Sequence, residues 1–101
     1  MGDLQGHVAL VTGAAGIGIG QAIARRLATD GAAVVVTDSH ERRTAEVTAK
    51  LRDETGAEVI GLPLDVSDRA RVDAVLAETA DRLGHVDILV NNAAVNVTGK
   101  I

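Results

Sequence analysis

The 101-residue chain is 47% hydrophobic and 24% charged, a composition typical of a soluble globular protein and unlike that of a disordered chain. Its net charge of −4 and the lack of a clustered Lys/Arg stripe argue against partners such as nucleic acid or an anionic membrane surface. Cysteine is absent, which excludes disulfides and thiolate metal sites and suits a cytoplasmic location; Phe, Tyr and Trp are also absent, so the core must be aliphatic.

Four aliphatic runs alternate with three helical patterns. The runs are rich in Val and Ile without strict alternation, as expected of strands buried on both faces, and cover residues 7–12, 33–37, 58–62 and 86–91. The first two helical patterns cover residues 20–29 and 41–54, and the third continues to Leu83 after Ser67 as a candidate N-cap. The residues expected on the inward faces are Ile23, Leu27, Val47, Thr48, Leu51, Val72, Val75, Leu76, Thr79 and Leu83.

This order of elements predicts an α/β fold. Right-handed crossovers give a Rossmann-type, doubly wound parallel sheet of four strands in the order 3-2-1-4, with the first two helices on one face and the third on the other. No linker divides the sequence, so residues 1–101 are expected to form a single domain. A ligand crevice is expected at the carboxyl ends of strands one and four, where the strand order reverses.

A glycine-rich turn follows the first predicted strand, with glycine at positions 13, 16, 18 and 20. Without Cβ atoms this backbone can approach a pyrophosphate closely, and the N–H groups and dipole of the following helix favour an anion. The alternative is a flexible turn whose small residues serve only helix packing.

Asp38 ends the second predicted strand, eighteen positions after Gly20. A dinucleotide-binding fold places an acid near this position, on the ribose hydroxyls, where a carboxylate would repel a 2′-phosphate and favour NAD over NADP. The alternative is an ordinary solvated acid that caps the second helix. The preference for NAD would weaken if His40, Arg42 or Arg43 turned toward the phosphate position.

Together these motifs resemble the N-terminal, NAD(P)-binding part of a classical short-chain dehydrogenase/reductase, and the resemblance covers essentially the whole chain. The family's signatures are similar to Thr12-Gly13 with Gly18 and Gly20, to Asp38, to Asp65-Val66 and to Asn91-Asn92-Ala93-Ala94. The resemblance implies a cofactor site made by Gly13, Gly18, Ile19, Gly20, Asp38, Asp65, Val66, Asn92 and Ala93. Taken alone, Asp65 is an ordinary loop acid and the two asparagines are a polar strand end.

Two features depart from the family pattern. Four residues separate Gly13 from Gly18 where the family usually has three, which indicates an insertion of one residue around Gly16-Ile17. Ala94 stands where the family usually has glycine, and its Cβ could crowd the cofactor.

The resemblance also implies chemistry by a Tyr, a Lys four residues later and an upstream Ser. The chain has no tyrosine, Ser39 and Ser67 fall in the nucleotide-binding half, and Asn96 lies four residues before Lys100. The three histidines lack metal-ligand spacing. We therefore assign no catalytic residue and no metal site, and we expect the 101-residue chain alone to be inactive.

Two functional hypotheses follow. In the first, the chain is the NAD(H)-binding part of an oxidoreductase that transfers hydride between nicotinamide and the carbonyl or secondary alcohol of an unknown small substrate. In the second, it is a non-catalytic nucleotide-binding or self-associating module. With no later strands in the sequence, residues 87–90 would form an aliphatic sheet edge, so we expect a homo-oligomer.

Overall fold

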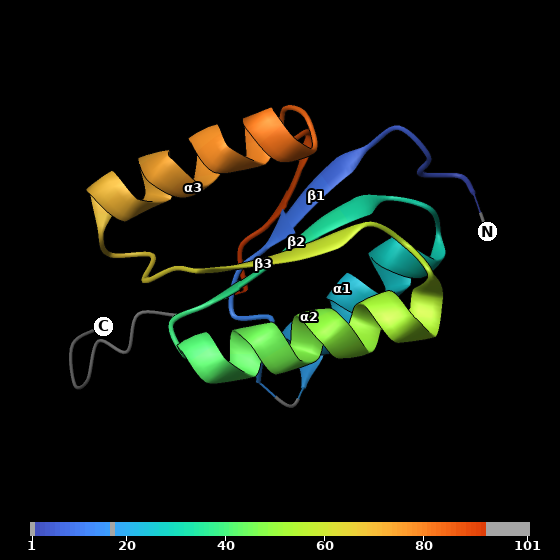
Figure 1. Ribbon diagram of the computed structural model, residues 1–101, viewed down its shortest axis with the longest axis horizontal. Helices are drawn as coiled ribbons and strands as arrows, with labels where there is room; N and C mark the ends of the chain where they lie inside the picture. Colours follow the sequence, from blue (N-terminus) through green and yellow to red (C-terminus); the bar gives the residue numbers. More distant parts are fainter. Residues whose placement is uncertain (1, 17, 93–101) are drawn as a thin grey trace, which may run out of the picture.

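The computed structural model describes residues 2–16 and 18–92, and in it a parallel sheet lies between two layers of helix (Figure 1). In chain order the elements are β1 (Val8–Val11), α1 (Ile19–Thr29), β2 (Ala33–Asp38), α2 (Glu41–Thr55), β3 (Val59–Pro63), α3 (Arg69–Arg82) and β4 (Ile88–Val90). The strand order is β3-β2-β1-β4, which confirms the predicted Rossmann-type topology. As predicted, α1 and α2 cover one face of the sheet and α3 covers the other.

Two aliphatic cores lie on the two faces of the sheet, because successive strand residues point in opposite directions. Under α1 and α2, the core contains Ala9, Val11, Val34, Val36, Val59, Ala24, Ala28, Val47 and Leu51. Under α3, it contains Leu10, Val35, Ile60, Leu62, Leu64 and Val75. Burial of both faces explains why β1 and β2 have no polar alternation in sequence.

The buried face of α1 is shifted by one position along the sequence from the predicted face. Its fully buried residues are Gly20, Ala24 and Ala28, whereas the predicted Ile23 and Leu27 are only partly buried beside them. Small residues let the helix axis approach the sheet more closely, so the larger side chains lie at the margin of the contact. Leu76 of α3, also predicted to face inward, is 42% exposed.

The predicted N-cap of α3 is also wrong. Its N-cap is Asp68 rather than Ser67, and the Asp68 carboxylate accepts a hydrogen bond of 3.1 Å from the backbone N–H of Arg71. Ser67 instead donates to Asp65, through both its backbone and its hydroxyl. Ser67 and Asp68 are adjacent and both are residue types that can cap a helix, so the sequence did not distinguish which of them is the N-cap.

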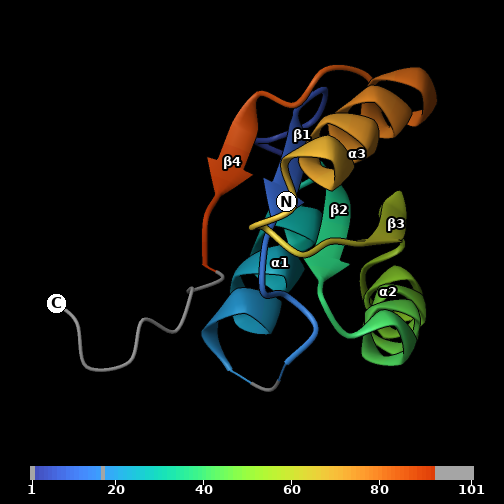
Figure 2. The same ribbon diagram turned by 90° about the vertical axis from the view of Figure 1, so that its left-hand side faces the viewer.

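β4 is shorter than predicted and lies at the edge of the described sheet, beside β1 (Figure 2). Asp87 fastens its amino end: the Asp87 N–H donates to the Val8 carbonyl at 3.0 Å, and the Asp87 carboxylate accepts from the Val8 N–H at 2.8 Å. The same carboxylate lies 2.7 Å from the His7 ring nitrogen Nδ1. These contacts hold the short strand in register with β1.

Candidate functional site

The turn between β1 and α1 has glycine where the backbone would strain other residues. Gly13 has a φ of 64° and Gly18 a φ of 139°, both in the left-handed region that a Cβ disfavours. Ile17 lies outside the described residues, so the geometry of this loop is that of residues 12–16 and 18–20. The predicted glycine-rich turn therefore has a backbone requirement at both of these positions.

Gly20 lies where the first turn of α1 packs against this loop. A Cβ added to Gly20 would lie 2.6 Å from Asn92 Nδ2 and still closer to the Gly13 carbonyl oxygen. At Gly16 and Gly18, in contrast, an added Cβ would meet no atom within 4 Å. One side of the loop is thus closely packed and the other side is open.

The residues that follow β4 form hydrogen bonds with the turn that follows β1. The Thr12 hydroxyl donates to Asn91 Oδ1 at 3.2 Å, and Asn92 Nδ2 donates to the Gly13 carbonyl at 3.3 Å. The backbone N–H of Thr12 also donates to the Val90 carbonyl at 3.0 Å. The structure therefore brings Asn92 to Gly13 and Gly20, although 72 or more residues separate them in sequence.

Asp38 is partly buried at the end of β2, and its carboxylate points to the glycine-rich loop. One carboxylate oxygen accepts a hydrogen bond from the Ala15 N–H at 3.2 Å, and the other accepts from the His40 N–H at 3.0 Å. The alternative role as a helix cap is wrong. His40 is the N-cap of α2, and its ring Nδ1 accepts from the Arg43 N–H at 3.1 Å.

The amino end of α1 is suited to an anion. Gly18 is the N-cap without a side-chain hydrogen bond, and the first turn of the helix contains no acidic residue. The partial positive charge of a helix amino end, together with its N–H groups, stabilises phosphate. Here this end adjoins the open side of the loop, beside the exposed Ile19.

Asp65 and Val66 differ in their surroundings. The exposed Asp65 carboxylate accepts from the Ser67 hydroxyl at 2.7 Å and from the Ser67 N–H at 2.9 Å, and these bonds lower the pKa of Asp65. Val66 packs against the core under α3 and lines a hollow of about 210 Å³ that also reaches Thr12, Asn91 and Leu89. This hollow places Val66 on the same side of the sheet ends as the residues that follow β4.

The structure thus gathers Gly13, Gly18, Gly20, Asp38 and Asn92 around one turn at the carboxyl edge of the sheet. The predicted Ala93 and the divergent Ala94 lie outside the described residues. Sequence reasoning missed Gln21, whose side-chain amide donates to the Gly16 carbonyl at 3.1 Å. Its only sequence signal is an arginine four residues later, the spacing of neighbours on one helix face.

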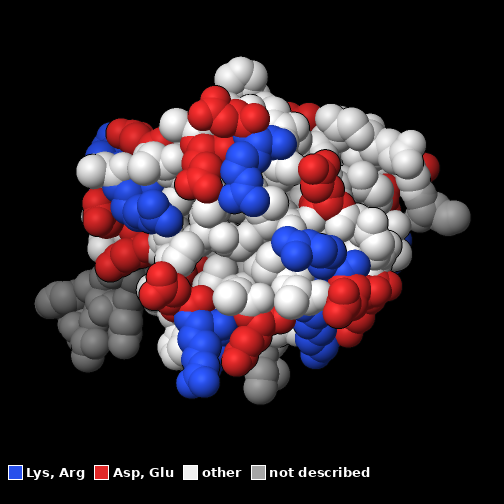
Figure 3. All heavy atoms as spheres, in the orientation of Figure 1, with Lys and Arg blue, Asp and Glu red and all other residues white. Residues whose placement is uncertain are grey.

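The surface and composition of the described part of the chain limit other kinds of site. Within residues 2–16 and 18–92, no three His, Cys, Asp or Glu side chains gather where they could hold a metal ion. None of the helices in this part combines the length and hydropathy that crossing a bilayer requires. On the face shown in Figure 3, basic and acidic side chains are interleaved rather than gathered by sign.

Comparison with known sequences gives one consistent family. A family model described as short chain dehydrogenase matches residues 7–101. The chain is 48% identical over 92 residues to the (5R,7aS)-5-hydroxy-7a-methyl-1-oxo-2,3,5,6,7,7a-hexahydro-1H-indene-carboxyl-CoA reductase of Mycobacterium tuberculosis, covering 91% of this chain and 35% of the relative. It is 38% identical over 94 residues to meso-2,3-butanediol dehydrogenase of Serratia marcescens, covering 93% and 36%.

Solved structures share the fold. A short chain dehydrogenase from Mycobacterium smegmatis has a TM-score of 0.88 and 44% identity, over 94% of this chain and 40% of that chain. L-sorbose reductase from Gluconobacter frateurii, solved with NADPH and L-sorbose, has a TM-score of 0.84 and 37% identity, over 91% and 35%. The chain therefore spans 35% to 40% of the length of these four proteins.

Proposed function

The chain belongs to the short-chain dehydrogenase family, and on this basis we propose that it is the NAD(H)-binding portion of an oxidoreductase. When bound, NAD(H) supplies hydride exchange with a carbonyl or secondary alcohol of the substrate. In this proposal residues 1–101 form one NAD(P)-binding domain that is partial relative to the family.

The observation that carries the proposal is the convergence of an uncapped helix end, an open glycine-rich loop and a fixed carboxylate. The amino end of α1 lacks a side-chain cap, and added Cβ atoms at Gly16 and Gly18 would enter open space. Asp38 is held beside this loop by the Ala15 N–H. An anion-binding end next to a carboxylate suits a dinucleotide, which has both phosphates and ribose hydroxyls.

Each predicted site residue has a place in this proposal. Gly13, Gly18, Ile19 and Gly20 bind the pyrophosphate through backbone N–H groups and close approach. Asp38 accepts hydrogen bonds from the adenosine ribose, Asp65 and Val66 bind the adenine, and Asn92 and Ala93 are assigned to a ribose of the cofactor. No residue of the chain is assigned to catalysis, and we expect no turnover by the 101-residue chain alone.

Titration with NADH and NADPH, followed by cofactor fluorescence, tests this function. We expect saturable binding with a preference for NADH, because the Asp38 carboxylate accepts from ribose hydroxyls and repels a 2′-phosphate. Asp38→Asn should weaken NADH binding about tenfold and strengthen NADPH binding, since it removes the charge and keeps the side-chain size.

Asp53→Asn is the matched control, because Asp53 is an exposed acid of α2 and its removal changes net charge equally. An unchanged cofactor preference in Asp38→Asn would refute the role of Asp38. Failure of the folded chain to bind either cofactor would refute the proposed function.

A further inference from the structure

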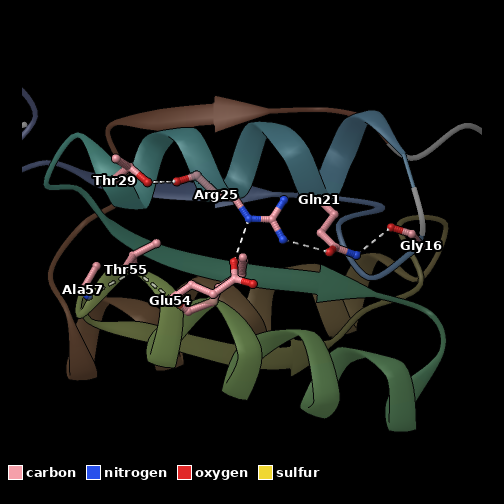
Figure 4. A network of polar contacts seen from close by, with 8 residues as sticks. Gly16, Gln21, Arg25, Thr29, Glu54, Thr55 and Ala57 are labelled. Carbon is pink, nitrogen blue, oxygen red and sulfur yellow. Dashed lines mark hydrogen bonds and ion pairs between the residues drawn. The ribbon is translucent and has the colours of Figure 1, made fainter.

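A chain of polar contacts connects the glycine-rich loop to α2 through one face of α1 (Figure 4). Gln21 Nε2 donates to the Gly16 carbonyl at 3.1 Å, and the guanidinium of Arg25 donates to Gln21 Oε1 at 3.3 Å. Arg25 Nε also donates to Glu54 Oε1 at 2.8 Å, in the last turn of α2. We call Gln21, Arg25 and Glu54 the loop brace.

The chemistry of the donors fixes the orientation of the Gln21 amide. An arginine side chain has donors only, so the Gln21 group that faces Arg25 must be the carbonyl oxygen. The NH₂ group then faces the Gly16 carbonyl, which can only accept. Glu54 in turn orients Arg25, and the hydrogen bond from Arg25 holds the pKa of Glu54 below its ordinary value.

The two halves of the described loop are held by different parts of the fold. Buried Ala14 and Ala15 donate their backbone N–H groups to the end of β2, to the Thr37 carbonyl at 3.0 Å and to the Asp38 carboxylate at 3.2 Å. Beyond them, Gly16 has no side chain, and nothing packs within 4 Å of its added Cβ position. The brace therefore acts on the segment of the loop that the core does not hold.

This segment is also where the sequence departs from the family spacing, with four residues between Gly13 and Gly18 instead of three. A longer loop has more conformations, and ordering it on binding costs affinity. A carbonyl oxygen turned toward an anion would also repel it, so a donor that keeps the Gly16 oxygen on α1 favours the conformation competent for phosphate.

We propose that the loop brace preorganises the enlarged phosphate-binding loop, with Gln21 as the positioning residue. This inference rests on the proposed NAD(H) site for its effect on binding, but the order it imposes on the loop exists without cofactor. Gln21 acts through the Gly16 carbonyl, and Arg25 and Glu54 act by orienting Gln21.

Amide hydrogen exchange of the cofactor-free chain, read on the peptide that spans the loop, tests the brace directly. Gln21→Met keeps the side-chain length but lacks the donor, and Gln21→Glu keeps an acceptor for Arg25 but loses the donor to Gly16. We expect both variants to speed loop exchange severalfold, with exchange in β2 and α2 unchanged. A role limited to linking α1 with α2 predicts instead that Gln21→Glu behaves as the wild type, and that result would overturn the proposal.

The neighbouring arginines provide matched variants. Arg25→Met should speed loop exchange, whereas Arg26→Met should not, because Arg26 pairs with Asp30 at the far end of the same helix at 2.9 Å. Equal effects of the two variants would contradict the brace.

Cofactor titration then separates this inference from the proposed function. Gln21→Met should weaken NADH binding about three- to tenfold, the loss expected for one neutral hydrogen bond. Faster loop exchange in a chain that binds no NADH in its wild-type form would uphold the brace and refute the NAD(H) site. Unchanged loop exchange with normal NADH binding would refute the brace alone.

Discussion

At Gly20, a single methyl group would collide with two parts of the fold at once, the Gly13 carbonyl and the Asn92 amide. Gly20→Ala should therefore destabilise the chain by about 1–3 kcal/mol, the usual cost of overpacking, despite the better helix propensity of alanine. Urea unfolding measures the difference. Gly16→Ala is the control, since its methyl group would meet open space. A Gly20→Ala variant as stable as this control would show that α1 can move away from the loop at little cost.

Asp87 gives the stability a predictable dependence on pH. The hydrogen bond from the Val8 N–H, and to a smaller extent the one with His7, lower the pKa of Asp87 below its ordinary value of 3.8. A carboxyl group whose pKa is lower in the folded chain stabilises the fold above the unfolded pKa, and this contribution is lost as pH falls through the folded value. Asp87→Asn should thus lower the free energy of unfolding at pH 7 and flatten its decline at acidic pH.

Denaturant unfolding between about pH 2 and pH 7 measures this effect over the range in which carboxylates titrate. Asp73→Asn, on the exposed side of α3, controls for the loss of one negative charge. Identical pH profiles for Asp87→Asn and Asp73→Asn would mean that the Asp87 contacts contribute nothing specific.

Single residues also show what the sequence could and could not predict at the site. The positions of the glycines and of Asp38 at one turn were predictable, because a strand, a turn and a helix in fixed order bring them together at the carboxyl edge of the sheet. The contact of Gln21 with Gly16 was not, because it depends on the path of the loop rather than on helical spacing. The sequence also could not predict which of Ser67 and Asp68 is the N-cap, since either side chain can cap a helix.

At the scale of elements, β4 shows how side chains can replace strand length. Only three of its residues pair with β1, yet Asp87 fixes one end, and Asn91 and Asn92 bind the β1 turn at the other. Strand existence and order were predictable from aliphatic runs and right-handed crossovers. Strand length was not, because Val86, Asp87 and Asn91 have the sequence character of strand residues, whereas Val86 packs against the core under α3 and the side chains of Asp87 and Asn91 bind β1 and its turn.

Helix faces show a related limit. For α2 the predicted inward residues Val47, Thr48 and Leu51 are buried, together with Thr44, which was not predicted. For α1 hydrophobic periodicity favoured the large Ile23 and Leu27 over the buried Ala24 and Ala28, because a hydrophobicity pattern weights size and not closeness of approach. The close approach of α1 is set by Gly20, which packs against the Gly13 carbonyl and the Asn92 amide, and the contact with Asn92 lies outside any local pattern.

For the whole molecule, the two faces of the sheet are unequally covered. Among the residues that the structure describes, α1 and α2 together bury the larger core, whereas α3 is the one helix on the other face, where Leu89 of β4 is 65% exposed and Leu76 is 42% exposed. Both leucines line the hollow of about 210 Å³ beside Val66. An exposed aliphatic residue on an edge strand promotes pairing between copies, so self-association stays a second hypothesis for this chain.

Sedimentation velocity at increasing concentration tests that property. We expect the sedimentation coefficient of the wild-type chain to rise with concentration, and Leu89→Gln to reduce the rise, because a polar side chain at the edge lowers the gain from burying it. Ile19→Gln is the control: Ile19 is 71% exposed but belongs to α1, which covers the face of the sheet opposite to that of Leu89. If both variants associate like the wild type, the edge is not the contact. If the wild-type chain stays monomeric at every concentration, the hypothesis of self-association is wrong.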